Sequence, residues 1–152
     1  MSMISRFRLL PSLLAIVLCI VALPASAELR EMGSDFRRML SNYHMTATIA
    51  QQCPELEMPE LVARPLVERS MQEKVGMEAF VNLMIAIQKS DLRSNAAATV
   101  EKLMTQVEGC DDERLPVVLE RIANVHSEAY QRFQQAPALV KPKDVPVPLR
   151  RN

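Results

Sequence analysis

The feature that most constrains this fold is the scarcity of residues that interrupt helices. The 152-residue chain contains only three glycines, and the segments between its prolines are rich in strong helix formers. Apolar and β-branched residues hardly ever alternate with polar ones at a period of two, so no strand is predicted. The sequence therefore predicts an all-α fold.

The N-terminal segment has the pattern of an export signal. Arg6 and Arg8 precede an apolar run over residues 9–23, and Ala25-Ser26-Ala27 offers a cleavage site. A membrane anchor is the weaker alternative, because 15 apolar residues fall short of the roughly 20 that span a bilayer. We expect a signal peptide over residues 1–27, periplasmic or secreted localisation, and no stable membrane anchor after cleavage.

The remaining chain divides into a helical domain over residues 28–136 and a tail over residues 137–152. Without Arg6 and Arg8 the chain keeps 16 basic against 18 acidic residues, so nucleic acid is not an expected partner. The tail is rich in proline and basic residues, and we expect it to be extended and disordered.

Helix signals in the domain predict four segments. Ser34 suits the N-cap of a first helix that runs to about Gln52. Pro65 suits the first turn of a second helix that reaches Lys89. Gly76 interrupts this second helix, and the neighbouring residues leave no room for a reversing loop, so a bend is expected, with two separate helices as the alternative.

Two further helices complete a predicted up-down bundle. The third has Ser94 or Asn95 as its N-cap and stops at Gly109. The fourth starts after Asp112 and tolerates Pro116 in its first turn.

Two cysteines remain after the predicted cleavage, Cys53 and Cys110. In an oxidising compartment such a pair is most simply a disulfide, and an up-down bundle of four segments places both residues at the same end. Neither cysteine belongs to a Cys-x-x-Cys motif, so the expected role is structural.

The segment from Met77 to Ile87 is apolar nearly all round. It is interpreted either as a central core helix or as a surface that a partner, a second copy or a ligand covers. The candidate surface residues are Met77, Phe80, Val81 and Met84.

Catalytic and metal-binding patterns are weak. The only histidines, His44 and His126, fall on different predicted helices and belong to no catalytic motif, so neither an enzyme nor a cofactor is predicted. His44 and Met45, with Met39 nearby, are the best local candidate for a copper(I) site, although the three do not share one helical face.

These observations favour a non-enzymatic exported envelope protein that binds another macromolecule. It would act as an inhibitor, immunity factor, chaperone-like protein or accessory subunit, with an unknown envelope protein or a second copy of itself as partner. The alternative is a carrier of a small ligand or of copper in the bundle interior.

Overall fold

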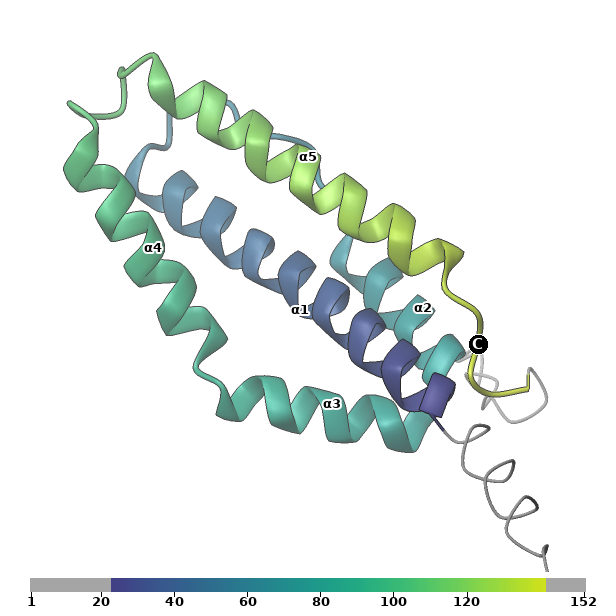
Figure 1. Cartoon of the computed structure of the whole chain (residues 1–152). Coiled ribbons are helices and arrows are strands. Elements are labelled where there is room, and N and C mark those ends of the chain that lie inside the picture. The colour runs from purple at the N-terminus through teal and green to yellow at the C-terminus, as the bar shows by residue number, and fades with distance from the viewer. Residues whose placement is uncertain (1–22, 142–152) are drawn as a thin grey trace, which may run out of the picture.

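The computed structural model describes residues 23–141, which form five helices and no strand (Figure 1). This confirms the all-α class. Residues 1–22 and 142–152 lie outside the described range, and with them most of the predicted signal peptide and most of the predicted tail.

The first helix, α1 (Leu23–Gln52), begins well before the predicted N-cap Ser34, which lies inside the helix. The prediction was wrong because Met32 extends the buried stripe of Phe36 and Met39 by one more turn, and no proline interrupts the chain between residues 25 and 53. The predicted cleavage site after Ala27 falls near the start of this helix.

The predicted single helix around Gly76 is two helices, α2 (Arg64–Val75) and α3 (Met77–Lys89). The expected bend was therefore wrong. Gly76 has φ 83° and ψ 163°, a backbone conformation that residues with a side chain rarely adopt, and its amide closes α2 by donating to the Gln72 carbonyl. In Figure 1, α3 turns away from α2 and crosses one end of the molecule.

Two long helices flank α1, α4 (Leu92–Gln106) on one side and α5 (Arg114–Gln135) on the other (Figure 1). The turn before α4 is made by Asp91 in the left-handed conformation, so Ser94 and Asn95 lie in the first turn and neither is its N-cap. The start of α5 just after Asp112 is as predicted.

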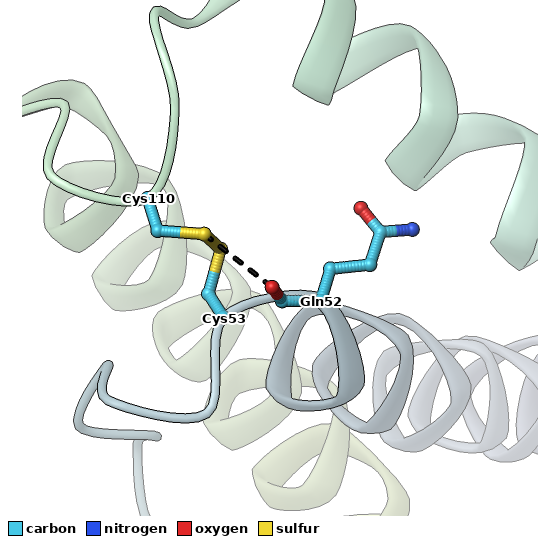
Figure 2. Close-up of a disulfide and its surroundings, with 3 residues drawn as sticks. All are labelled: Gln52, Cys53 and Cys110. Carbon is cyan, nitrogen blue, oxygen red and sulfur yellow. Dashed lines mark hydrogen bonds between the residues drawn. A yellow bond between two sulfur atoms is a disulfide. The ribbon is translucent and has the colours of Figure 1, made fainter.

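The disulfide between Cys53 and Cys110 is present and joins the loops that follow α1 and α4 (Figure 2). The two Cα atoms are 5.5 Å apart, within the usual range for a bridged pair. The Cys110 sulfur also lies 3.5 Å from the Gln52 carbonyl oxygen, a contact only, since a disulfide sulfur carries no proton. The split at Gly76 adds a helix between the two cysteines, which in a purely up-down bundle would place them at opposite ends. They still meet at one end, because α3 runs across the bundle instead of along it.

The core consists of two clusters along α1. The larger lies between α1, α2, α3 and α5 and includes three fully buried methionines, Met32, Met39 and Met71. The smaller lies toward the disulfide and contains Ile49, Val100, Leu119 and Ile122. Between residues 23 and 141, no helix is both long and apolar enough to cross a bilayer.

The first residues after α5 are hydrogen-bonded to the end of α2. The amides of Leu139 and Val140 donate to the Lys74 carbonyl at 2.7 and 3.3 Å, and the Lys74 ammonium donates to the Ala136 carbonyl. The beginning of the predicted tail thus has defined contacts beside Gly76, at the junction of α2 and α3.

Candidate functional site

One side of α3 packs against the larger core cluster. Ile87 is buried in that cluster, and Phe80, Leu83 and Met84 are half-buried against it. The Phe80 ring meets the Phe36 ring of α1 edge-on, with centroids 6.2 Å apart. These contacts hold α3 across the end of α1 and position the rest of the helix.

The other side of α3 is open to solvent. Met77, Val81 and Ile85 are 43%, 44% and 44% exposed, and they follow one another at spacings of four. The interpretation of this segment as an enclosed core helix is therefore wrong. A helix that crosses the end of a small bundle has neighbours on one side only.

A groove of about 530 Å³ runs between α3, α1 and the starts of α2 and α4. Three of the candidate surface residues line it, Phe80, Val81 and Met84, whereas Met77 lies outside it. Leu40 of α1 and Leu92 of α4 add further apolar side chains. The exposed row and the groove therefore overlap, because Val81 and Ile85 belong to both.

Charged and titratable residues lie along the same groove. His44, Arg64, Asp91 and Arg93 are all part of its lining. Burial, followed by the nearby charges of Arg64 and Arg93, lowers the pKa of His44 below its ordinary value. This edge of the groove thus carries a positive potential.

The two arginines differ in their pairing. Arg64 Nε lies 2.7 Å from Glu68 Oε1, an exposed pair one turn apart on α2. The Arg93 guanidinium has no ion pair or hydrogen bond among residues 23–141. Arg93 is therefore the freer of the two cations at the groove.

The sequence interpretation did not single out Arg64 or Arg93, although a signal existed. Each lies in the first turn of a helix that has no acidic residue in that turn. The helix dipole disfavours a cation at this position. A basic residue there, without an acidic partner in the turn, is a reason to look for a binding role.

The proposed copper ligands are not brought together. Met39 is fully buried in the larger core cluster, Met45 packs against the smaller one, and His44 faces the groove. Within the part of the chain that the structure describes, no group of three or more His, Cys, Asp or Glu residues could hold a metal ion.

His126 lies in the interior, away from the groove lining. It is 1% exposed, its ring meets the Tyr43 ring edge-on at 4.9 Å, and neither ring nitrogen has a hydrogen-bond partner among the described residues. Burial lowers the pKa of His126. Burial also raises the pKa of Tyr43 to about 12, and the Tyr43 hydroxyl donates to the Val62 carbonyl.

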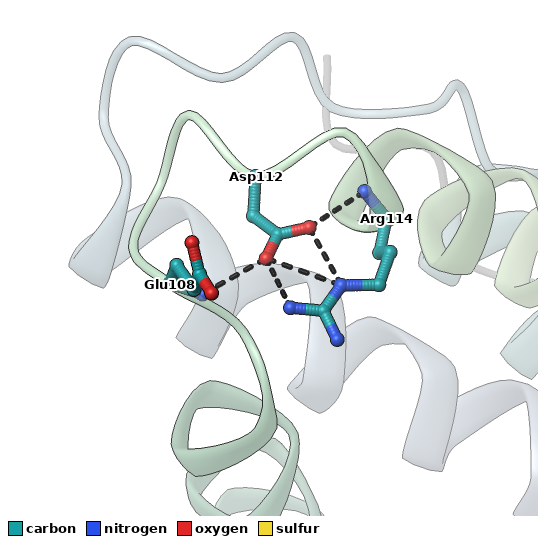
Figure 3. A network of polar contacts seen from close by, with 3 residues as sticks. All are labelled: Glu108, Asp112 and Arg114. Atoms are coloured by element: carbon teal, nitrogen blue, oxygen red, sulfur yellow. Dashed lines mark hydrogen bonds and ion pairs between the residues drawn. The ribbon is translucent and has the colours of Figure 1, made fainter.

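The acidic run from Asp111 to Glu113 has a structural explanation. Asp112 accepts hydrogen bonds from the side chain of Arg114 and from the backbone amides of Glu108 and Arg114 (Figure 3). These bonds, that of the Arg114 side chain first, hold the pKa of Asp112 well below its usual range. Asp112 thereby fixes the loop and the start of α5.

The chain matches no protein-family model, no curated protein and no solved structure.

Proposed function

We propose that this chain is a non-enzymatic exported protein of the cell envelope that works by binding another macromolecule through α3. The observation that supports this function is the exposed row of Met77, Val81 and Ile85. The disulfide and the predicted signal peptide support an oxidising compartment outside the cytoplasm.

The row has the geometry of a helix-docking surface. Residues four apart form a ridge along a helix, and such ridges pack into the grooves of a second helix. Of the six large apolar residues that are exposed between positions 27 and 141, three belong to this one ridge, whereas Leu29, Leu66 and Val117 are on other helices. The partner is accordingly an amphipathic helix of another protein, whose apolar stripe covers the row.

The surface suits roles that need binding without chemistry. An inhibitor, an immunity factor, a chaperone-like protein or an accessory subunit acts by covering part of its partner. The apolar row supplies the contact area, and the disulfide holds the other end of the bundle in one shape. A second copy of this chain is the rival occupant, since a ridge on one copy can meet the same ridge on another.

Co-purification tests this function. The full chain with a C-terminal affinity tag is expressed in its own cells, cross-linked gently and purified. We expect a stoichiometric partner protein with the parent chain and its loss in Met77→Glu, because a carboxylate cannot be buried against an apolar stripe.

Val117→Glu is the control, because Val117 is an exposed apolar residue on α5, outside the row, at 56% exposure against 43% for Met77. Retention of the partner by Met77→Glu and Ile85→Glu, both folded by circular dichroism, would exclude α3 as the docking surface. A concentration-dependent dimer in sedimentation velocity, with no second protein, would identify the second copy as the occupant.

A second candidate function, that of a small-ligand carrier, is favoured by one observation. The groove beside α3 combines a volume of about 530 Å³, within the usual range for small-molecule sites, with a lining that is mainly apolar.

A further inference from the structure

We infer that the groove between α1, α3 and α4 binds a long-chain carboxylate, with the alkyl chain on its apolar floor and the carboxylate beside Arg93. This inference rests on the second candidate function. The groove shares Val81 and Ile85 with the exposed row but does not include Met77. The apolar floor of the groove and the charges at its edge support this inference.

The floor of the groove suits a flexible apolar chain. Leu40, Phe80, Met84, Ile85 and Leu92 come from three helices and all contribute to the lining. Met84 adds a side chain that adapts easily to an irregular apolar ligand.

The charges at the edge favour an anion. Arg64 and Arg93 bring two positive charges, and Asp91 brings one negative charge. The start of α4 adds to the positive side, because its first turn has no acidic residue and Asp91 makes no side-chain capping bond. An alkyl chain that ends in a cation would meet repulsion here, and one that ends in a neutral group would gain nothing.

A carboxylate fits Arg93 in particular. A guanidinium can donate two parallel hydrogen bonds to a carboxylate, and the guanidinium of Arg93 is not engaged by any residue between 23 and 141. Arg64 Nε is already paired with Glu68 Oε1 at 2.7 Å, so Arg64 is less available for a direct hydrogen bond to the ligand and adds only a partly neutralised positive charge. His44, whose pKa is lowered, is neutral at pH 7.5 and can donate one further hydrogen bond.

Titration calorimetry of the full chain with dodecanoate, below its micelle concentration and at pH 7.5, tests the inference. We expect saturable binding of one dodecanoate per chain, and binding at least about tenfold weaker for dodecanol and for dodecylammonium. No binding of dodecanoate, or equal binding of all three compounds, would overturn the inference.

Substitutions locate the ligand. Arg93→Gln should weaken dodecanoate binding about tenfold, whereas Arg121→Gln, an exposed arginine of α5 outside the groove, should leave it unchanged. Asp91→Asn should tighten it, because the one negative charge of the lining is removed. Equal affinities of the Arg93 and Arg121 variants, both folded by circular dichroism, would rule out the carboxylate position.

The two functional hypotheses fail separately. Met77 lies outside the groove, so Met77→Glu should lose a partner protein and keep dodecanoate binding. Arg93→Gln should lose dodecanoate affinity and keep the partner protein. Loss of dodecanoate binding in Met77→Glu would place the ligand on the exposed row and contradict the inference.

Discussion

At the end of the bundle where α1 and α4 finish, a disulfide and the hydrogen bonds of Asp112 fix the loops, whereas the end that α3 crosses is held mainly by side-chain packing. The first end exposes polar and acidic residues. The second exposes Met77, Val81 and Ile85, which contribute little to the core. The comparison indicates that covalent and polar constraints are concentrated at one end, and that the exposed apolar row and the larger core cluster lie at the other.

Each of the two junctions of α3 contains a residue with an unusual backbone conformation. Gly76 and Asp91, which flank α3, both have positive φ values of 83° and 50°. Asp91 is an exposed non-glycine residue in the left-handed region, a conformation that is uncommon for residues with a side chain. The direction of α3 is thus set by two special residues, and a bulky or β-branched substitution at either should disturb it, whereas Asn at position 91 tolerates the left-handed conformation.

The largest expected effect is at the disulfide end. Cys110→Ser should lower the free energy of unfolding by about 4 kcal/mol, because the bridge closes a loop with a sequence separation of 57 in the unfolded chain. Chemical denaturation followed by circular dichroism measures this, with reductant added to the parent chain as control. Equal stability of mutant and parent would show that the bridge is not the main constraint at this end.

At the α3 end, Gly76→Ala should cost about 2 kcal/mol, because its backbone conformation is strained for any residue with a side chain. An added Cβ would also lie 3.2 Å from Val140, which packs there. Gly109→Ala is the control, since Gly109 has φ 116° but no atom near an added Cβ. A larger loss for Gly109→Ala would contradict a role for the Val140 contact.

His126, in the core between the two ends, should make the free energy of unfolding depend on pH. Burial lowers its pKa in the folded state, so the unfolded chain binds more protons near pH 6. The free energy of unfolding should be highest above about pH 6.5, the ordinary histidine pKa, and should fall as the pH drops from there toward the folded pKa.

Unfolding measured at pH 7.5 and pH 5.5 tests this for the parent and for His126→Phe, which keeps an aromatic ring beside Tyr43. The decrease in the free energy of unfolding from pH 7.5 to pH 5.5 should be smaller in His126→Phe than in the parent. His44→Gln separates the smaller contribution of His44, whose pKa is also lowered. An unchanged loss in His126→Phe would place the titration elsewhere.

The smallest effect on stability is expected on the exposed row. Val81→Asn should change the free energy of unfolding by no more than about 0.5 kcal/mol, because Val81 is 44% exposed. Ile87→Ala on the same helix should cost about 3 kcal/mol, because Ile87 is buried. Similar losses for the two would contradict the separation of the exposed row from the core.

The features that follow from local chemistry were predictable from the sequence. Helix formers and prolines determine the all-α class, and the helix start after Asp112 follows from a short polar side chain before an apolar stripe. The disulfide follows from the pair of cysteines that remains after the predicted signal peptide.

The features that depend on contacts between distant segments were not predictable from the sequence. Whether Gly76 bends or splits a helix depends on its neighbours in space, including Val140 and the Lys74 carbonyl. The apolar part of the candidate site was recognisable in Met77, Phe80, Val81 and Met84. Its polar edge was not, because Arg64 and Arg93 come from different helices and only the fold brings them to one groove.

The disulfide also decides how the molecule carries mechanical load. Cys53 and Cys110 enclose α2, α3 and α4 in a covalent ring, while α1 and α5 lie outside it. A force applied to the two chain ends passes through the sulfur atoms and bypasses the ring, so about 200 Å of chain stays unextended while the bridge is oxidised. The helix with the exposed row is therefore shielded from tension, and reduction would release it as a separate extension step.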